Sequence, residues 1–144
     1  MFKNIFIFHF IFFMMGCAHY DEGTVLRETP LGISETRKVM TTIFGEPRYI
    51  SQNGREMTSQ FYDTKGRFGT FEKERSRLYT HIVILGERRP YDIQVMVKVQ
   101  ARDGGKFQDV AIDERRSREA AEKIQQALNE SRDKRNFIDD FKPF

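Results

Sequence analysis

The apolar residues of this chain form one long run at the start and shorter periodic patterns after it. Between residues 5 and 15 only His9 interrupts the apolar side chains, and the chain turns polar directly after Cys17 and Ala18. As a helix, this run would rise about 16 Å, whereas a bilayer core is about 30 Å thick. The run is therefore too short for a comfortable transmembrane helix.

Two later stretches have helical periodicity. Residues 34–44 place their apolar side chains on one helical face, with Ser34 as the expected N-cap and Gly45 and Pro47 as the stop. Asp113 is the expected N-cap of a longer helix that ends near residue 136. Its narrow stripe of small and apolar residues suits close packing on a sheet; the stripe consists of Ala120, Ile124, Ala127, Leu128 and Ser131.

Strand patterns fill the middle of the chain. The dipeptide Asn53–Gly54 predicts a hairpin with a type I′ turn, in which Ile50 faces Met57. Residues 91–102 alternate apolar and polar side chains, with Met96 as the exception, which predicts a strand with one buried face. Further strands are expected at residues 77–85 and 107–112, and a weak one at residues 68–71.

These elements predict an α+β fold. It has a short N-terminal helix, a four- to five-stranded, mostly antiparallel sheet, and a long C-terminal helix packed on one sheet face. Residues 18–30 lack apolar periodicity and contain Gly23 and Pro30, so they are expected to form a flexible tether. Residues 31–144 then form a single domain. The apolar residues 137–144 either fold back over the core or dock a partner.

Composition narrows the classes of function. The formal charge is +3, and removal of Lys3 with the leader leaves about +2 on a well-mixed surface. This balance gives no reason to expect a nucleic-acid partner. Cys17 is the only cysteine, which excludes an internal disulfide and a cysteine-based metal site.

The N-terminus has the order of parts of a secretory signal: Lys3, the apolar run, and the small residue Gly16 before Cys17. Met14-Met15-Gly16-Cys17 resembles the lipobox of bacterial lipoproteins. That resemblance implies cleavage after residue 16 and a diacylglycerol thioether on Cys17, followed by the tether over residues 17–30. An ordinary cleaved signal with a leftover cysteine and an uncleaved anchor remain the alternatives.

No catalytic constellation, cofactor motif or metal site is visible. His81 is the only histidine within the expected fold, and a lone strand histidine indicates a sheet surface more than a general base. Gly104–Gly105 lacks the strand–loop–helix context of a phosphate-binding loop. The basic groups at residues 88–89, 115–118 and 132–135 are expected on solvated surfaces, with anionic headgroups or a partner as the alternative.

A second resemblance covers residues 31–62. Leu31-Gly32-Ile33-Ser34, then Phe44-Gly45-Glu46-Pro47 and a hairpin, are similar to the opening of the BamE/SmpA-like outer-membrane assembly lipoproteins. The resemblance implies a helix packed on an antiparallel sheet. The long helix from Asp113 is not part of that small fold.

Together these observations predict a lipid-anchored, non-catalytic envelope protein that acts as an interaction or scaffold module. The alternatives are an envelope enzyme or small-ligand-binding domain, and a soluble exported protein without lipid. Ala18 occupies the position where some enterobacterial lipoproteins carry an aspartate that retains them in the inner membrane. By that resemblance, the protein is expected on the outer membrane, facing the periplasm and a possible envelope protein partner.

Overall fold

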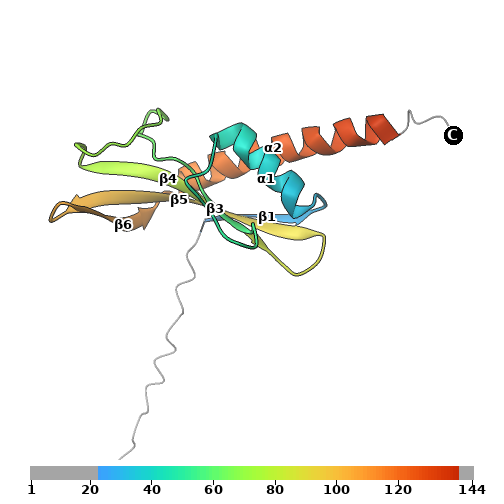
Figure 1. The fold of residues 1–144 in the computed structure, drawn as a ribbon, viewed down its shortest axis with the longest axis horizontal. Coiled ribbons are helices and arrows are strands. Elements are labelled where there is room, and N and C mark those ends of the chain that lie inside the picture. The colour runs from blue at the N-terminus through green and yellow to red at the C-terminus, as the bar shows by residue number, and fades with distance from the viewer. Residues whose placement is uncertain (1–22, 140–144) are drawn as a thin grey trace, which may run out of the picture.

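The computed structural model describes the backbone of residues 23–139 and the side chains of residues 23–134. These residues form two layers, a six-stranded antiparallel sheet and two helices on one of its faces (Figure 1). The strands are β1 (Thr24–Thr29), β2 (Tyr49–Ile50), β3 (Glu56–Thr58), β4 (Ser76–Leu85), β5 (Tyr91–Asp103) and β6 (Lys106–Ile112). The helices are α1 (Ile33–Phe44) and α2 (Glu114–Asp139). The prediction of an α+β fold with a long C-terminal helix on the sheet is confirmed.

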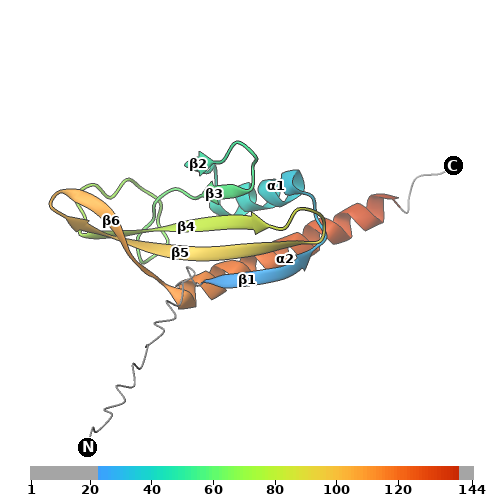
Figure 2. The same ribbon diagram turned by 90° about the horizontal axis from the view of Figure 1, so that it is seen from below.

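The long strand β5 organises the sheet, whose order is β1-β5-β4-β3-β2 with β6 also paired to β5. Strand β1 pairs with the first half of β5 and β6 with the second half, so the two lie end to end along one edge (Figure 2). Between them, Val97 donates its N–H to Ser117 Oγ and accepts from the N–H of Asp113, each at 2.8 Å. The first turn of α2 therefore fills the gap at this edge.

The sheet has more strands than the four or five predicted from the sequence. Residues 24–29, which were expected to belong to a tether, form the edge strand β1. Leu26 is the only apolar residue of β1 that packs against the core, so the strand shows no alternation of apolar and polar residues. Pairing with β5 holds β1 in place. A bulge near Glu28, at φ 57°, breaks the register before Thr29. The folded domain thus begins before residue 31.

Residues 68–71 do not form the expected strand. Phe68 makes only an isolated bridge to Tyr62, which itself bridges Leu78 of β4. A tight turn at Asp63–Arg67, closed by backbone hydrogen bonds between these two residues and from Gly66 to Asp63, precedes the bridge.

The hairpin of β2 and β3 has the predicted register but a different turn. Ile50 pairs with Met57, as expected. Only Gly54 in the turn has a positive φ, 67°, and its N–H bonds to Ser51 O at 2.9 Å, so the turn is not the predicted type I′. Asn53 Oδ1 instead accepts hydrogen bonds from Ser51 Oγ and the Arg55 N–H. The Asn53 side chain therefore adds to the backbone hydrogen bond that closes the turn.

The helix ends also differ in part from expectation. Helix α1 begins at Ile33 with Gly32 as its N-cap, because Glu35 Oε2 accepts the Gly32 N–H at 2.9 Å. Ser34 therefore lies in the first turn and not at the cap. Asp113 does cap α2, since its Oδ1 accepts the Arg116 N–H at 3.0 Å.

The core lies between the sheet and both helices. Strand β5 has the predicted alternation, and Ile93, Val95 and Val97 are at most 1% exposed on the helix side. Helix α2 contributes residues on its predicted stripe together with Ala121. The buried core comprises Leu31, Val39, Met40, Met57, Leu78, Ile82, Ile93, Val95, Val97, Ala120, Ala121, Ile124 and Leu128. The last turns of α2 extend past the sheet (Figure 2).

Candidate interaction surface

The sheet face opposite the helices, here called the open face, carries charged and aromatic side chains. Residues 78, 80 and 82 of β4 are buried toward the helices, so the alternation of a strand turns Arg77, Tyr79 and His81 to the open face. Gln100 pairs with Arg77 and Lys98 with Tyr79, which places both β5 residues on the same face. The open face is thus built mainly from β4 and β5.

Arg77 lies between two phenylalanine rings. Its guanidinium carbon is 3.4 Å from the ring centroid of Phe61 and 3.8 Å from that of Phe107. Arg48 lies 4.2 Å from the Phe61 centroid, and Arg102 lies 5.0 Å from the Phe107 centroid. We call these five side chains the arginine column. Contacts of this kind are worth about 0.5–2 kcal/mol each, which favours one arrangement of the column.

Polar contacts fix the central arginine. Arg77 Nε donates to Gln100 Oε1 at 2.8 Å, and its Nη1 donates to the Thr70 carbonyl at 3.2 Å. Partial burial lowers the pKa of Arg77, and the positive charges of Arg48 and Arg102 lower this pKa further. An arginine stays charged at neutral pH despite such a shift. The lowered pKa of Arg77 therefore reflects its partial burial and the closeness of the other two cations.

The three arginines of the column form no ion pair with any carboxylate of the described residues. Arg102 donates to the backbone carbonyl of Glu72, whose carboxylate is the nearby charge that raises the pKa of Arg77. Arginine guanidinium groups bind carboxylates and phosphates through paired hydrogen bonds. The column therefore presents guanidinium groups of the kind that bind anions.

Other carboxylates of the open face are engaged within the protein. Asp109 accepts hydrogen bonds from the Tyr79 hydroxyl and from Gln100 Nε2, each at 2.8 Å. Glu56 Oε1 lies 2.8 Å from His81 Nε2. Neither carboxylate forms an ion pair with Arg48, Arg77 or Arg102.

An open hollow of about 480 Å³ adjoins the column. Arg48 and Arg77 lie on its wall together with Gln60 and Thr70. Glu72 also lines the hollow, and because the hollow is open to solvent it suits part of a larger surface more than an enclosed small molecule.

A second hollow, of about 260 Å³, lies between α1, α2 and the turn that follows β3. The Tyr62 hydroxyl on its wall is 2.9 Å from Thr80 Oγ1, and burial raises the pKa of Tyr62. Arg116, Glu119 and Lys123 line its rim. One tyrosine with two positive charges and one negative charge around it does not form a catalytic arrangement for any particular reaction.

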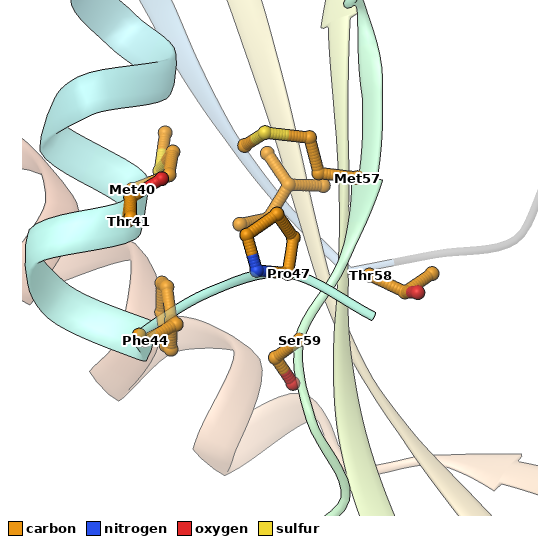
Figure 3. A pocket seen from close by; sticks show the side chains of 9 residues that line it. Met40, Thr41, Phe44, Pro47, Met57, Thr58 and Ser59 are labelled. Carbon is orange, nitrogen blue, oxygen red and sulfur yellow. The ribbon is translucent and has the colours of Figure 1, made fainter. Parts of the chain in front are cut away.

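Two further hollows carry less chemistry. A crevice between α1 and β3 is lined by Met40, Phe44 and Met57, and its free volume of about 10 Å³ is at the lower limit for one water (Figure 3). A groove of about 480 Å³ between β1 and α2 has Leu26 and Ala121 in its wall beneath polar residues of α2.

The residues singled out from the sequence do not meet at one site. Cys17 and His19 lie outside the described residues. His81 lies on the open face with Glu56, and it lines none of the hollows described above. The backbone of α2 continues to Asp139, while residues 140–144 of the expected apolar tail lie outside the described residues.

Among the basic side chains of α2 that the structure describes, those of residues 115, 118, 132 and 134 are exposed, as expected, and that of Arg116 is partly exposed. Arg116 Nε lies 3.0 Å from Asp113 Oδ2, and Arg115 pairs with Glu119 one turn later. Arg88 and Arg89 are exposed in the loop between β4 and β5. None of these groups belongs to the arginine column.

Sequence reasoning missed the arginine column because its members are far apart in the chain. The alternation of β4 and β5 places Arg77 and Arg102 on outward positions, which is a usable signal. The position of Phe61, in the segment after β3, leaves no periodic trace.

Along the part of the chain described here, no group of three or more His, Cys, Asp or Glu side chains is placed to hold a metal ion. No helix within residues 23–139 is long and apolar enough to cross a membrane. No protein-family model matches the chain, and no curated protein matches it.

Proposed function

We propose that this protein is a lipid-anchored, non-catalytic module of the bacterial envelope that binds an anionic partner through its open face. The observation that carries the binding half of this proposal is the arginine column, in which Arg48, Arg77 and Arg102 have no ion-paired carboxylate among the described side chains. The anchor rests on the sequence at Gly16–Cys17.

The energetic argument concerns preorganisation. A long arginine side chain normally loses rotamer entropy when it binds an anion. Stacking on Phe61 and Phe107 and hydrogen bonding to Gln100 have already restricted Arg77 before a partner arrives. Binding to a restricted side chain therefore costs less entropy.

The lipid supplies attachment without a transmembrane helix. One acyl chain attaches a protein to a membrane only marginally, whereas two or more chains anchor the protein stably. A thioether on Cys17 would also remove the single free thiol of the chain. The proposed location is the outer membrane, facing the periplasm, as expected from Ala18.

The anchor is tested by the intact mass of the mature protein and by membrane fractionation. We expect a mass that corresponds to residues 17–144 plus acyl chains, in the membrane fraction. Cys17→Ser should abolish the acylation and release the protein from membranes or leave it unprocessed. Ala18→Ser, a neighbouring change outside the modified atom, is the control. Unchanged processing and fractionation of Cys17→Ser would show an exported protein without lipid.

The binding surface is tested by cross-linking in envelopes from cells that produce the full chain. Arg48→Gln with Arg102→Gln removes two exposed cations of the column without opening the core. Arg88→Gln with Arg89→Gln makes the same charge change in an exposed loop away from it. If the partner is an envelope protein, only the first pair should lose cross-links. Equal cross-linking by both pairs contradicts a protein partner at the column.

A further inference from the structure

We propose that the anionic partner of the arginine column is the lipid surface itself, so that the open face lies against the membrane that holds Cys17. This inference rests on the proposed lipid anchor and adds a second, electrostatic contact to it. Arg48 and Arg102 would reach phosphate groups of anionic lipids, and the helix layer would face away from the bilayer.

The first argument is the short distance from the anchor to the fold. Cys17 precedes Gly23, the first described residue, by six positions, which span at most about 20 Å. Strand β1 begins directly after Gly23, at Thr24 paired with Val95. An anchored domain therefore has its β1 end held within about 20 Å of the headgroups.

The second argument is the side of the sheet at which Gly23 lies. A Cβ added to Gly23 would be 2.7 Å from Met96 Cγ. Met96 pairs with His81, whose side chain is on the open face. Beyond this point the edge of β5 is occupied by α2, which bonds to both backbone groups of Val97. Gly23 thus contacts the open face, at a place where the helix side is filled.

The third argument is the position of the charges relative to that point. On β4, Arg77 is four residues from His81, or roughly 13 Å along the strand. The column thus lies on the same face as the Gly23 contact and within one domain width of it. Arg48 and Arg102, at its two ends, are exposed.

Charge complementarity favours a lipid surface. The column presents several cations side by side on one face of the sheet, and the adjoining hollow is open to solvent. Anionic headgroups form a continuous array that can contact all the cations at once. Each arginine near such a surface strengthens attachment by about fivefold, so Arg48 and Arg102 together contribute about 25-fold.

The test uses the full-length protein, matured in cells and reconstituted in vesicles. A fluorophore is placed at Thr70→Cys, beside the column, or at Gln126→Cys, exposed on α2. Vesicles contain phosphatidylglycerol or only phosphatidylcholine, with a quencher on a headgroup. We expect quenching at position 70 and little at position 126, in the anionic vesicles. Arg48→Gln with Arg102→Gln should abolish the difference, and Arg88→Gln with Arg89→Gln should preserve it.

Three other outcomes would contradict the proposed contact between the open face and the membrane. Equal quenching at both positions, or quenching indifferent to lipid charge, overturns the proposed orientation. Displacement of the contact by polyglutamate, with no preference for anionic lipid, would identify an acidic polypeptide as the partner and also overturn it.

Failure of the anchor is distinguishable, because the intact mass would then lack acyl chains. In that case the same protein is sedimented with vesicles. A roughly 25-fold loss of binding to anionic vesicles in the Arg48 and Arg102 double variant supports the lipid contact on its own. Binding that this variant does not change overturns it.

Discussion

Ser117 illustrates how one small side chain joins α2 to the sheet. It is fully buried, its Oγ accepts the N–H of Val97 and its hydroxyl donates to the carbonyl of Asp113, both at 2.8 Å. Ser117→Ala would leave the buried N–H of Val97 without a partner, at the place between β1 and β6 where this edge of β5 has no paired strand. We expect a loss of about 1–3 kcal/mol in the free energy of unfolding, measured by urea denaturation. Ser131→Ala, half-buried on the same helix, is the control and should cost less.

The carboxyl group of Asp63 leads to a prediction of how the stability of the fold depends on pH. The Arg67 N–H, the Arg67 side chain and the Lys65 N–H all hydrogen-bond to its charged form and lower the pKa of Asp63. A lowered pKa in the folded state gives stability above the unfolded pKa, near 3.9, that is lost as the pH falls through the folded value. Asp63→Asn should therefore be less stable than the wild type at pH 7, with a gap that closes below about pH 4. Carboxyl NMR titration of Asp63 that shows an ordinary pKa would contradict this.

At the scale of the element, the hairpin turn depends on Gly54. Its φ of 67° is unfavourable for a residue with a Cβ, and a Cβ there would lie 3.1 Å from Arg37 Nη1 of α1. Gly54→Ala should lower the free energy of unfolding by about 1–2 kcal/mol from the backbone alone. Gly104→Ala is a matched control, because Gly104 has a φ of 54° and open space around it. Equal losses for the two variants would mean that the Arg37 contact costs nothing.

The elements that sequence reasoning predicted well are those whose own pattern is strong. The alternation of β5 and the stripe of α2 each record which face is buried, so their positions and buried faces are readable. Strand β1 is different, because pairing with β5 holds it in place and its own residues show no regular alternation of apolar and polar side chains. The N-cap at Gly32 was missed for a related reason: glycine has no side chain to cap the helix, and the bond at this end runs from the Gly32 N–H to the Glu35 side chain one turn later.

At the scale of the whole molecule, the candidate site was not predictable from the sequence. Arg48, Phe61 and Arg77 come together only after the chain has crossed from β3 to β4, and Phe107 arrives from β6. The alternation of β4 and β5 places Arg77 and Arg102 on one face, but local periodicity carries no information on their contacts with Phe61 and Phe107. The N-terminal prediction at Cys17 is of the opposite kind, because a signal and its modified cysteine are read from adjacent residues. It stays a prediction here, since Cys17 lies outside the described residues.

The length of α2 leads to a prediction about where the folded molecule ends. The buried residues of α2 end at Leu128, while residues 132–134 are exposed and the last turns extend past the sheet (Figure 2). The free energy of unfolding of a chain that ends at Lys134 should therefore lie within about 0.5 kcal/mol of that of the full chain. The measurement is urea denaturation monitored by circular dichroism.

A chain that ends at Ala120 loses Ala121, Ile124 and Leu128, each at most 3% exposed. Burial of a residue such as Ile124 is worth about 2–5 kcal/mol, against a typical total stability of 5–15 kcal/mol. The shorter chain should therefore fail to fold, and it shows that the assay detects loss of the core. A large loss of stability in the chain that ends at Lys134 would mean that residues 137–144 fold back over the core, the first of the two interpretations of that apolar segment. Unchanged stability leaves the segment free for a partner, because an apolar end that contributes nothing to its own fold has surface to bury elsewhere.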